Sequence, residues 1–131
     1  MLRTWSPLDP DTERCVSEVV DSGIAVHWEV GPGFAEPVYH NAFCVELEYR
    51  GIAFESEKSI VIRYRNTRVG IHRLDLVVAQ RVIIEIKAVK GLADVHEAQI
   101  LSYLRASGLR VGLLMNFGES TLRQGLRRFV R

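Results

Sequence analysis

The chain has 131 residues, of which 47% are hydrophobic and 25% are charged, and these values are typical of one globular domain with a single core. Its apolar runs are too short to cross a bilayer, and residues 1–7 lack the apolar segment of a secretory signal. We therefore expect a cytoplasmic protein with no membrane contact. Cys15 and Cys44 show no metal-binding spacing, and we expect buried free thiols rather than a disulfide.

Charge is distributed unevenly along the chain. Residues 1–62 contain 4 Lys/Arg and 11 Asp/Glu, whereas residues 63–131 contain 13 Lys/Arg and 5 Asp/Glu. The net charge of +1 therefore conceals a basic second half. A folded domain with this distribution can present a basic face to nucleic acid, although pairing of these charges within the fold would give the same totals.

The first part of the chain predicts two helices. Asp9-Pro10 is a good helix start, with an aspartate cap and a proline in the first turn. This helix is predicted to end near Gly31-Pro32-Gly33, which is a strong breaker. A second helix is predicted from about residue 35 to residue 50, with Gly51 as its C-terminal stop.

The rest of the chain predicts a sheet with further helices. Strands are predicted at 52–65, with a bend near 58–59, at 69–78 and at 81–88, with hairpin connections at 66–67 and 79–80. A third helix at about 95–107 leads to a buried strand at 111–116, which we expect to pair parallel to the sheet because a helix precedes it. The tail, residues 119–131, is predicted to form a basic helix. The sequence thus indicates one α/β domain over residues 1–131, a mixed central sheet flanked by helices.

Two acids and a lysine interrupt the apolar strands around the second hairpin. Asp75 and Glu85 are symmetric about Gln80, so a turn there would place them opposite each other and on the same face. Lys87 lies two residues further along its strand and therefore points to that face as well. The sequence predicts that these three side chains converge.

Convergence of two acids requires a compensating cation. Two carboxylates ~5 Å apart repel by roughly 3 kcal/mol at an effective dielectric near 20. Oxygen ligands with few histidines nearby favour Mg²⁺ or Mn²⁺, and such an ion could activate water and polarise a phosphate, with Lys87 positioning the water or stabilising the phosphate. The alternative is a salt bridge on an exposed sheet face, which contributes little to stability.

Three further residues are candidates for the same site. Gln99 and Tyr103 are four residues apart and share one face of the third helix, which a parallel crossover would lay over the sheet near Lys87. The alternative is an ordinary amphipathic edge of the helix, with Tyr103 half-buried. Glu36 opens the second helix, where a carboxylate is favoured by the helix dipole; it is either a capping residue or an additional metal ligand.

Basic residues near the predicted site are candidates for contacts with a nucleic acid. Arg73 would pair across from Lys87 and so face the same cleft, where it could grip a phosphate. Lys90 and Arg105 could extend a phosphate-contacting stripe into the tail arginines. A solvated surface is the alternative for all of them.

Together these residues resemble the PD-(D/E)XK nuclease superfamily, whose fold is restriction-endonuclease-like. The motif that carries the resemblance is Asp75, followed after nine residues by Glu85-Ile86-Lys87. The segment from Gln99 to Tyr103 resembles the QxxxY element of several branches of that superfamily, and the segment from Gly33 to Tyr39 is similar to the signature of the bacterial GxxExxY proteins. The resemblance covers about residues 10–118, although Arg73-Leu74 stand before Asp75 where the superfamily name has a proline.

The resemblance implies an α-β-β-β-α-β core with a site where the central strands diverge. It implies that Asp75 and Glu85 are metal ligands, that Lys87 is the catalytic lysine and that Glu36 is an additional acidic residue. Gln99 and Tyr103 would be accessory.

The leading hypothesis from the sequence is a nuclease that depends on Mg²⁺ or Mn²⁺ and hydrolyses phosphodiester bonds of DNA or RNA. The rival hypothesis is a non-catalytic module that retains the fold and binds nucleic acid or assists assembly. The modest net charge and the small size favour a partner that supplies specificity, either a second copy of the chain or another protein.

Overall fold

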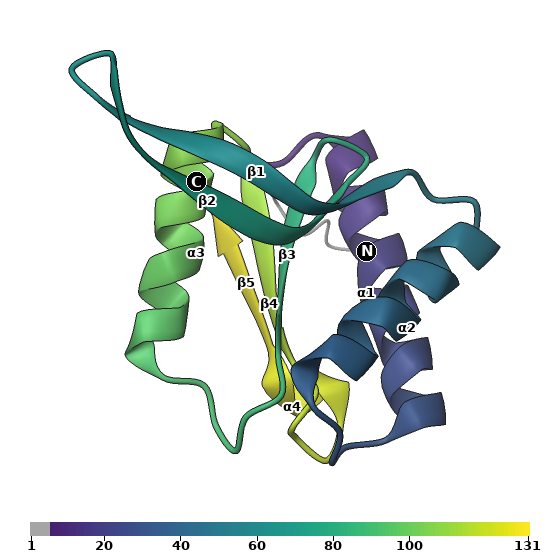
Figure 1. Ribbon diagram of the computed structural model, residues 1–131. Coiled ribbons are helices and arrows are strands. Elements are labelled where there is room, and N and C mark those ends of the chain that lie inside the picture. The colour runs from purple at the N-terminus through teal and green to yellow at the C-terminus, as the bar shows by residue number, and fades with distance from the viewer. Residues whose placement is uncertain (1–5) are drawn as a thin grey trace.

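The computed structural model describes residues 6–131 (Figure 1). The expectation about the N-terminal segment rests largely on residues 1–5, which lie outside the described residues. The elements are, in chain order, α1 (Pro10–Val30), α2 (Glu36–Tyr49), β1 (Phe54–Tyr64), β2 (Thr67–Val78), β3 (Val82–Lys87), α3 (Asp94–Ser107), β4 (Val111–Asn116), α4 (Leu122–Gly125) and β5 (Leu126–Val130). This order contains the predicted α-β-β-β-α-β core.

The five strands form one mixed sheet in the order β1-β2-β3-β4-β5. Only β3 and β4 run parallel, whereas the other three neighbouring pairs are antiparallel. Figure 1 shows α1 and α2 on one face of the sheet and α3 on the other. The predicted fold class, a mixed sheet flanked by helices, is confirmed.

Local signals in the sequence set the ends of the helices. The Asp9 carboxylate accepts a hydrogen bond from the backbone N–H of Thr12 at 2.9 Å, and Pro10 occupies the first turn of α1. Gly31 and Gly51 end α1 and α2 with φ values of 74° and 70°, a region that glycine enters without steric cost. No helix among residues 6–131 has the length and apolar character needed to span a membrane.

Each face of the sheet has its own core. The larger core packs α1 and α2 against the sheet and contains the fully buried rings of Tyr39, Phe43 and Phe117. The smaller core lies beneath α3, around Leu74 and Ile83. Burying both faces of the central strands explains why the run from Val82 to Ile86 is almost entirely apolar.

The β2–β3 hairpin has the predicted register. Val78 pairs with Val82 and Leu76 pairs with Ile84, so the ladder is symmetric about residue 80. Beyond that last pair the two strands separate: β2 continues beside β1, while β3 continues beside β4. We call this point of separation the strand fork, and it lies at Asp75 and Glu85.

The tail differs from the prediction. The sequence predicts a basic helix over residues 119–131, but only one helical turn forms, capped by Thr121, before the chain enters β5 and pairs with β4. Leu126 and Val130 pack on the larger core and Phe129 on the smaller one. A sheet edge with apolar surface on both faces therefore outweighs the local helical preference of the tail.

Smaller differences concern the ends of the strands and the cysteines. In β1 the backbone has a positive φ of 55° at Glu57, next to the bend predicted near residues 58–59, and the register shifts between Ile62 and Arg63. The first hairpin turns at Arg65 and Asn66. Cys15 and Cys44 are free thiols, as predicted, with Cys15 buried and Cys44 half-buried.

Candidate active site at the strand fork

The two acids replace ladder hydrogen bonds at the strand fork. The backbone N–H of Asp75 donates to Glu85 Oε1 at 3.2 Å, and the backbone N–H of Ile86 donates to Asp75 Oδ2 at 2.7 Å. Each carboxylate therefore uses one oxygen to satisfy a backbone group that the separating strands leave without its usual partner. The sequence prediction that these two acids converge agrees with this geometry.

Glu85 is buried next to a second acid. Only 6% of its surface is exposed. Burial, followed by the charge of Asp75, raises the pKa of the Glu85 carboxyl to about 8, whereas the Asp75 backbone N–H and Lys87 act in the opposite direction. A buried acid with this pKa either holds a proton or requires a nearby cation.

Glu36 and Lys87 lie close enough to the acids to affect their charge. Burial raises the pKa of the Glu36 carboxyl, Lys87 lowers it and Asp75 raises it. Glu36 is half-buried at the start of α2, where Ala35 is the N-cap and no side chain provides a capping hydrogen bond. The Glu36 carboxylate nevertheless lies in the first turn of α2, where the helix dipole favours a negative charge, as the alternative from the sequence expects. Among residues 6–131, Lys87 forms no ion pair, so its amine stays available.

A cavity of about 500 Å³ opens beside Asp75 and contains residues that the sequence reasoning missed. Its lining includes Glu36, His40 and Glu57. His40 accepts or donates a hydrogen bond with Ser56 Oγ at 2.7 Å. Its position four residues after Glu36, on the same helix face, was a signal that could have identified it. Glu57, whose φ is 55°, also lines the cavity. A positive φ at a glutamate is a backbone feature that the sequence does not reveal.

Tyr103 approaches the two acids from α3. Burial, together with the charges of Glu85 and Asp75, raises the pKa of Tyr103 to about 12, so the hydroxyl stays protonated. The hydroxyl is hydrogen-bonded to His72 Nε2 on β2. Gln99 is exposed one turn earlier on the helix and lines, with Tyr103 and Arg105, a groove of about 870 Å³ between α3 and the β1–β2 hairpin.

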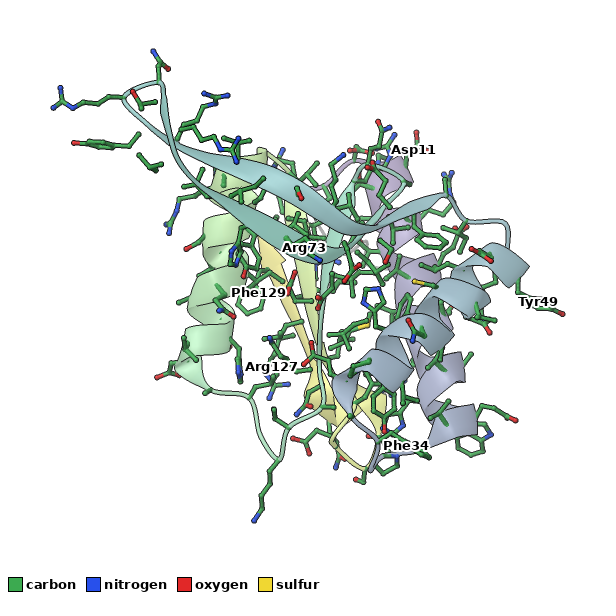
Figure 2. All side chains as sticks on the ribbon, in the orientation of Figure 1. Asp11, Phe34, Tyr49, Arg73, Arg127 and Phe129 are labelled. Atoms are coloured by element: carbon green, nitrogen blue, oxygen red, sulfur yellow. The ribbon has the colours of Figure 1, made fainter. Side chains whose placement is uncertain are left out.

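The other predicted basic residues lie further from the acids. Arg73 does not pair across from Lys87, because the strands have separated by then; it pairs with Ser59 on β1. Its guanidinium lies exposed, 3.7 Å from the carboxylate of Glu57 (Figure 2). Lys90 is exposed in the loop after β3.

Asn116 fixes the chain that follows Lys87. Its fully buried side chain accepts hydrogen bonds from the backbone N–H of Val89 at 2.9 Å and of Gly118 at 3.0 Å. It also donates to the carbonyl of Val89 at 2.9 Å. The end of β3, and with it Lys87, is thereby tied to the end of β4.

The donor set suits a hard divalent cation. Within residues 6–131, no three His, Cys, Asp or Glu side chains are already arranged around a common metal position, so Glu36 does not complete a ready-made site with the other two acids. However, the backbone bonds occupy one oxygen of each acid at the fork, and carboxylate oxygens are the ligands that Mg²⁺ and Mn²⁺ prefer. A cation there would also offset the cost of ionising Glu85.

Comparison with known proteins agrees with this geometry. The family model described as the PD-(D/E)XK nuclease superfamily matches residues 13–129. No curated protein sequence and no solved structure matches the chain. The matched residues include α2, both strands of the fork and α3, and the match confirms the superfamily assignment made from the motifs.

Proposed function

The chain belongs to the PD-(D/E)XK nuclease superfamily, and from this membership we propose that it is a metal-dependent nuclease that hydrolyses phosphodiester bonds of DNA or RNA. The observation that carries the proposal is the pairing of the buried Glu85 with the half-buried Asp75 at the strand fork, with Lys87 beside them. An exposed surface salt bridge, the alternative weighed for these residues, does not fit an acid that is 6% exposed and has a pKa of about 8.

The proposed roles follow from where the residues lie. Asp75 and Glu85 would hold Mg²⁺ or Mn²⁺, and Glu36 lines the same cavity as Asp75. When bound, the cation supplies positive charge and Lewis acidity next to the scissile phosphate. The free amine of Lys87 orients the attacking water or donates a hydrogen bond to a phosphate oxygen as negative charge develops there.

Residues on α3 would place the substrate. The Tyr103 hydroxyl keeps its proton, so it can donate a hydrogen bond to a phosphate oxygen. Gln99 and Arg105 line the same groove and would contact the nucleic acid on its way to the acids. Lys90 and Arg73, both exposed, would bind phosphates further out.

Metal binding is the first test of this proposal. Calorimetry with Mn²⁺ should detect binding to the wild-type protein and much weaker binding to Asp75→Asn. Asparagine keeps an oxygen for the Ile86 N–H but removes the charge, so the sheet should stay intact. Equal binding by the two proteins would remove the enzyme hypothesis and leave the non-catalytic module.

Cleavage of labelled DNA and RNA is the second test. Lys87→Ala should cut on the order of 10²–10³-fold more slowly than wild type, because it removes a donor aimed at developing charge. Lys58→Ala is a suitable control, since Lys58 is paired with Glu55 on β1 and has no proposed role. If both variants cut at the wild-type rate, the activity does not come from this site.

A further inference from the structure

The outer part of the β1–β2 hairpin projects from the domain. We call residues 61–71 the hairpin arm. Figure 1 shows that its end extends beyond α3, and Figure 2 shows side chains there that point into solvent. Every residue from 63 to 69 is exposed. The arm therefore contributes little to the core, so packing does not constrain which side chains it carries.

The hairpin arm carries positive charge that nothing nearby neutralises. Residues 58–74 contain no Asp or Glu. Arg63 and Arg68 are ladder partners, directly opposite each other, and like charges in that position destabilise a hairpin. Neither they nor Arg65 form an ion pair within the described part of the chain. A polyanion bound to the arm would relieve this repulsion.

We propose that the hairpin arm binds the phosphate backbone of double-stranded DNA. A two-stranded ribbon fits the wide major groove of B-form DNA, whereas the major groove of double-stranded RNA is too narrow. Arginines on both strands of the ribbon can then reach the phosphates beside the groove. Binding of single strands relies on stacking of bases on aromatic rings, and the ring of Tyr64, the arm's one aromatic, already lies 5.7 Å from the Arg65 guanidinium.

The groove beneath α3 connects the hairpin arm with the strand fork. Its lining runs from Arg63 on the arm, past His72, to Tyr103 next to the acids. Arg68 and Asp75 are seven residues apart on β2, which is about 23 Å along a strand and about seven base-pair steps along a duplex. If the fork is the cleavage site, a point that rests on the proposed function, the arm holds the duplex about seven base pairs from the cut.

Binding without cleavage tests this inference separately from catalysis. The dissociation constant for a 30-base-pair DNA duplex would be measured between 50 and 200 mM salt without divalent ions. The double variant Arg63→Gln/Arg68→Gln should bind on the order of tenfold more weakly at about 0.1 M salt. When the logarithm of its association constant is plotted against the logarithm of the salt concentration, the slope should be less steep by about 2, because two phosphate contacts are lost. The wild type should prefer the duplex over a single strand of equal length, and the variant should lose most of that preference.

The matched control is Arg14→Gln/Arg123→Gln, which removes the same charge from two exposed arginines on α1 and α4. Its salt dependence should equal that of the wild type. Equal slopes for the arm variant and the control, or wild-type binding that does not distinguish duplex from single strand, would overturn the inference. A wild type that binds duplex through the arm but never cuts would contradict only the proposed function. If the wild type cuts DNA and the arm variant still binds the duplex as tightly as the wild type, only the inference about the arm is contradicted.

Discussion

At the scale of single residues, the central feature is an acid that the fold places where its charge is costly. Glu85 lies 6% exposed, with Asp75 beside it. The pKa of about 8 means that, without a cation, the folded protein retains a proton there when the unfolded chain has already lost it. Folding stability therefore depends on pH through this side chain.

The sign of that dependence gives a prediction. The folded-state pKa of Glu85 lies above the unfolded value of 4.5, so its contribution to stability is full below pH 4.5 and falls as the pH rises to about 8. Glu85→Gln, which does not ionise, should gain on the order of 1–3 kcal/mol relative to the wild type between about pH 5 and 8 in metal-free buffer. Urea unfolding at both pH values measures this. If the difference in free energy of unfolding between the two proteins were the same at both pH values, the raised pKa of Glu85 would be contradicted.

The sequence predicts some site residues well and others not at all, for physical reasons. Asp75 and Glu85 could be paired because strand alternation and one turn position fix which residues face each other. Arg73 was misplaced by the same rule, which holds only while the strands stay paired. The position of Glu57 depends on a backbone irregularity, and that of Asn116 on the close approach of two chain segments, neither of which leaves a periodic pattern.

At the scale of the elements, the junction of the β3 and β4 ends is packed too closely for an extra methyl group. A Cβ on Gly118 would lie 2.2 Å from the carbonyl oxygen of Val89, and Asn116 ties the same two segments together. This contact fixes the loop that follows Lys87. The parallel pairing of these strands therefore depends on a small residue outside both of them.

Gly118→Ala should consequently destabilise the protein by about 1–3 kcal/mol, because a backbone segment rather than a flexible side chain must move. Cleavage should also slow, since that segment follows Lys87. Gly70→Ala is the control: a Cβ there meets nothing within 4 Å, so its effect should stay within about 0.5 kcal/mol. Thermal unfolding of both variants compares the two sites, and similar melting temperatures would argue against the close packing.

The tail shows why an element can be read wrongly from local sequence. Arginine is a good helix former, and the pattern of residues 119–131 has no strict alternation. The outcome depends on β4, whose free edge offers hydrogen bonds to Leu126–Val130 and apolar surface on two faces. In a strand, Arg127 and Arg128 point to opposite faces, so the tail arginines do not form the single basic stripe considered from the sequence.

At the scale of the whole molecule, the last strand is tied to the first helix. Arg128 forms an ion pair with Glu13, and this guanidinium, with the hydroxyl of Ser6, lowers the pKa of the Glu13 carboxyl to about 2. The two residues are 115 positions apart. The pair therefore links the ends of the domain on the face away from α3.

This pair should stabilise the protein only while Glu13 is ionised. The lowered pKa means that its contribution is present above pH 4.5 and is lost as the pH falls towards 2. Arg128→Gln should cost about 1 kcal/mol at neutral pH, since both side chains are about one-third exposed and partly screened. The neighbouring Arg127→Gln removes the same charge without breaking the pair. Urea denaturation of the two variants measures their free energies of unfolding. The difference between Arg128→Gln and Arg127→Gln should be smaller near pH 2.5 than at pH 7.

The order and packing of the main elements could be predicted from the sequence better than the structure at the two ends of the sheet. Helix stops at glycine, a parallel crossover through α3 and apolar strands buried on both faces each have a direct physical cause in the sequence. The projection of the hairpin arm and the pairing of β5 depend instead on where the rest of the sheet ends. Such features emerge only when the complete sheet is assembled.

The strand fork also bears on how such a protein can change over evolutionary time. Because Asp75 and Glu85 each close a gap between separating strands, a descendant that gave up chemistry could not discard them without weakening its own scaffold. Side chains that still offer an oxygen, such as asparagine or glutamine, would be the tolerated replacements. A silent relative would thus retain the outline of the catalytic pair long after selection for cutting had ended.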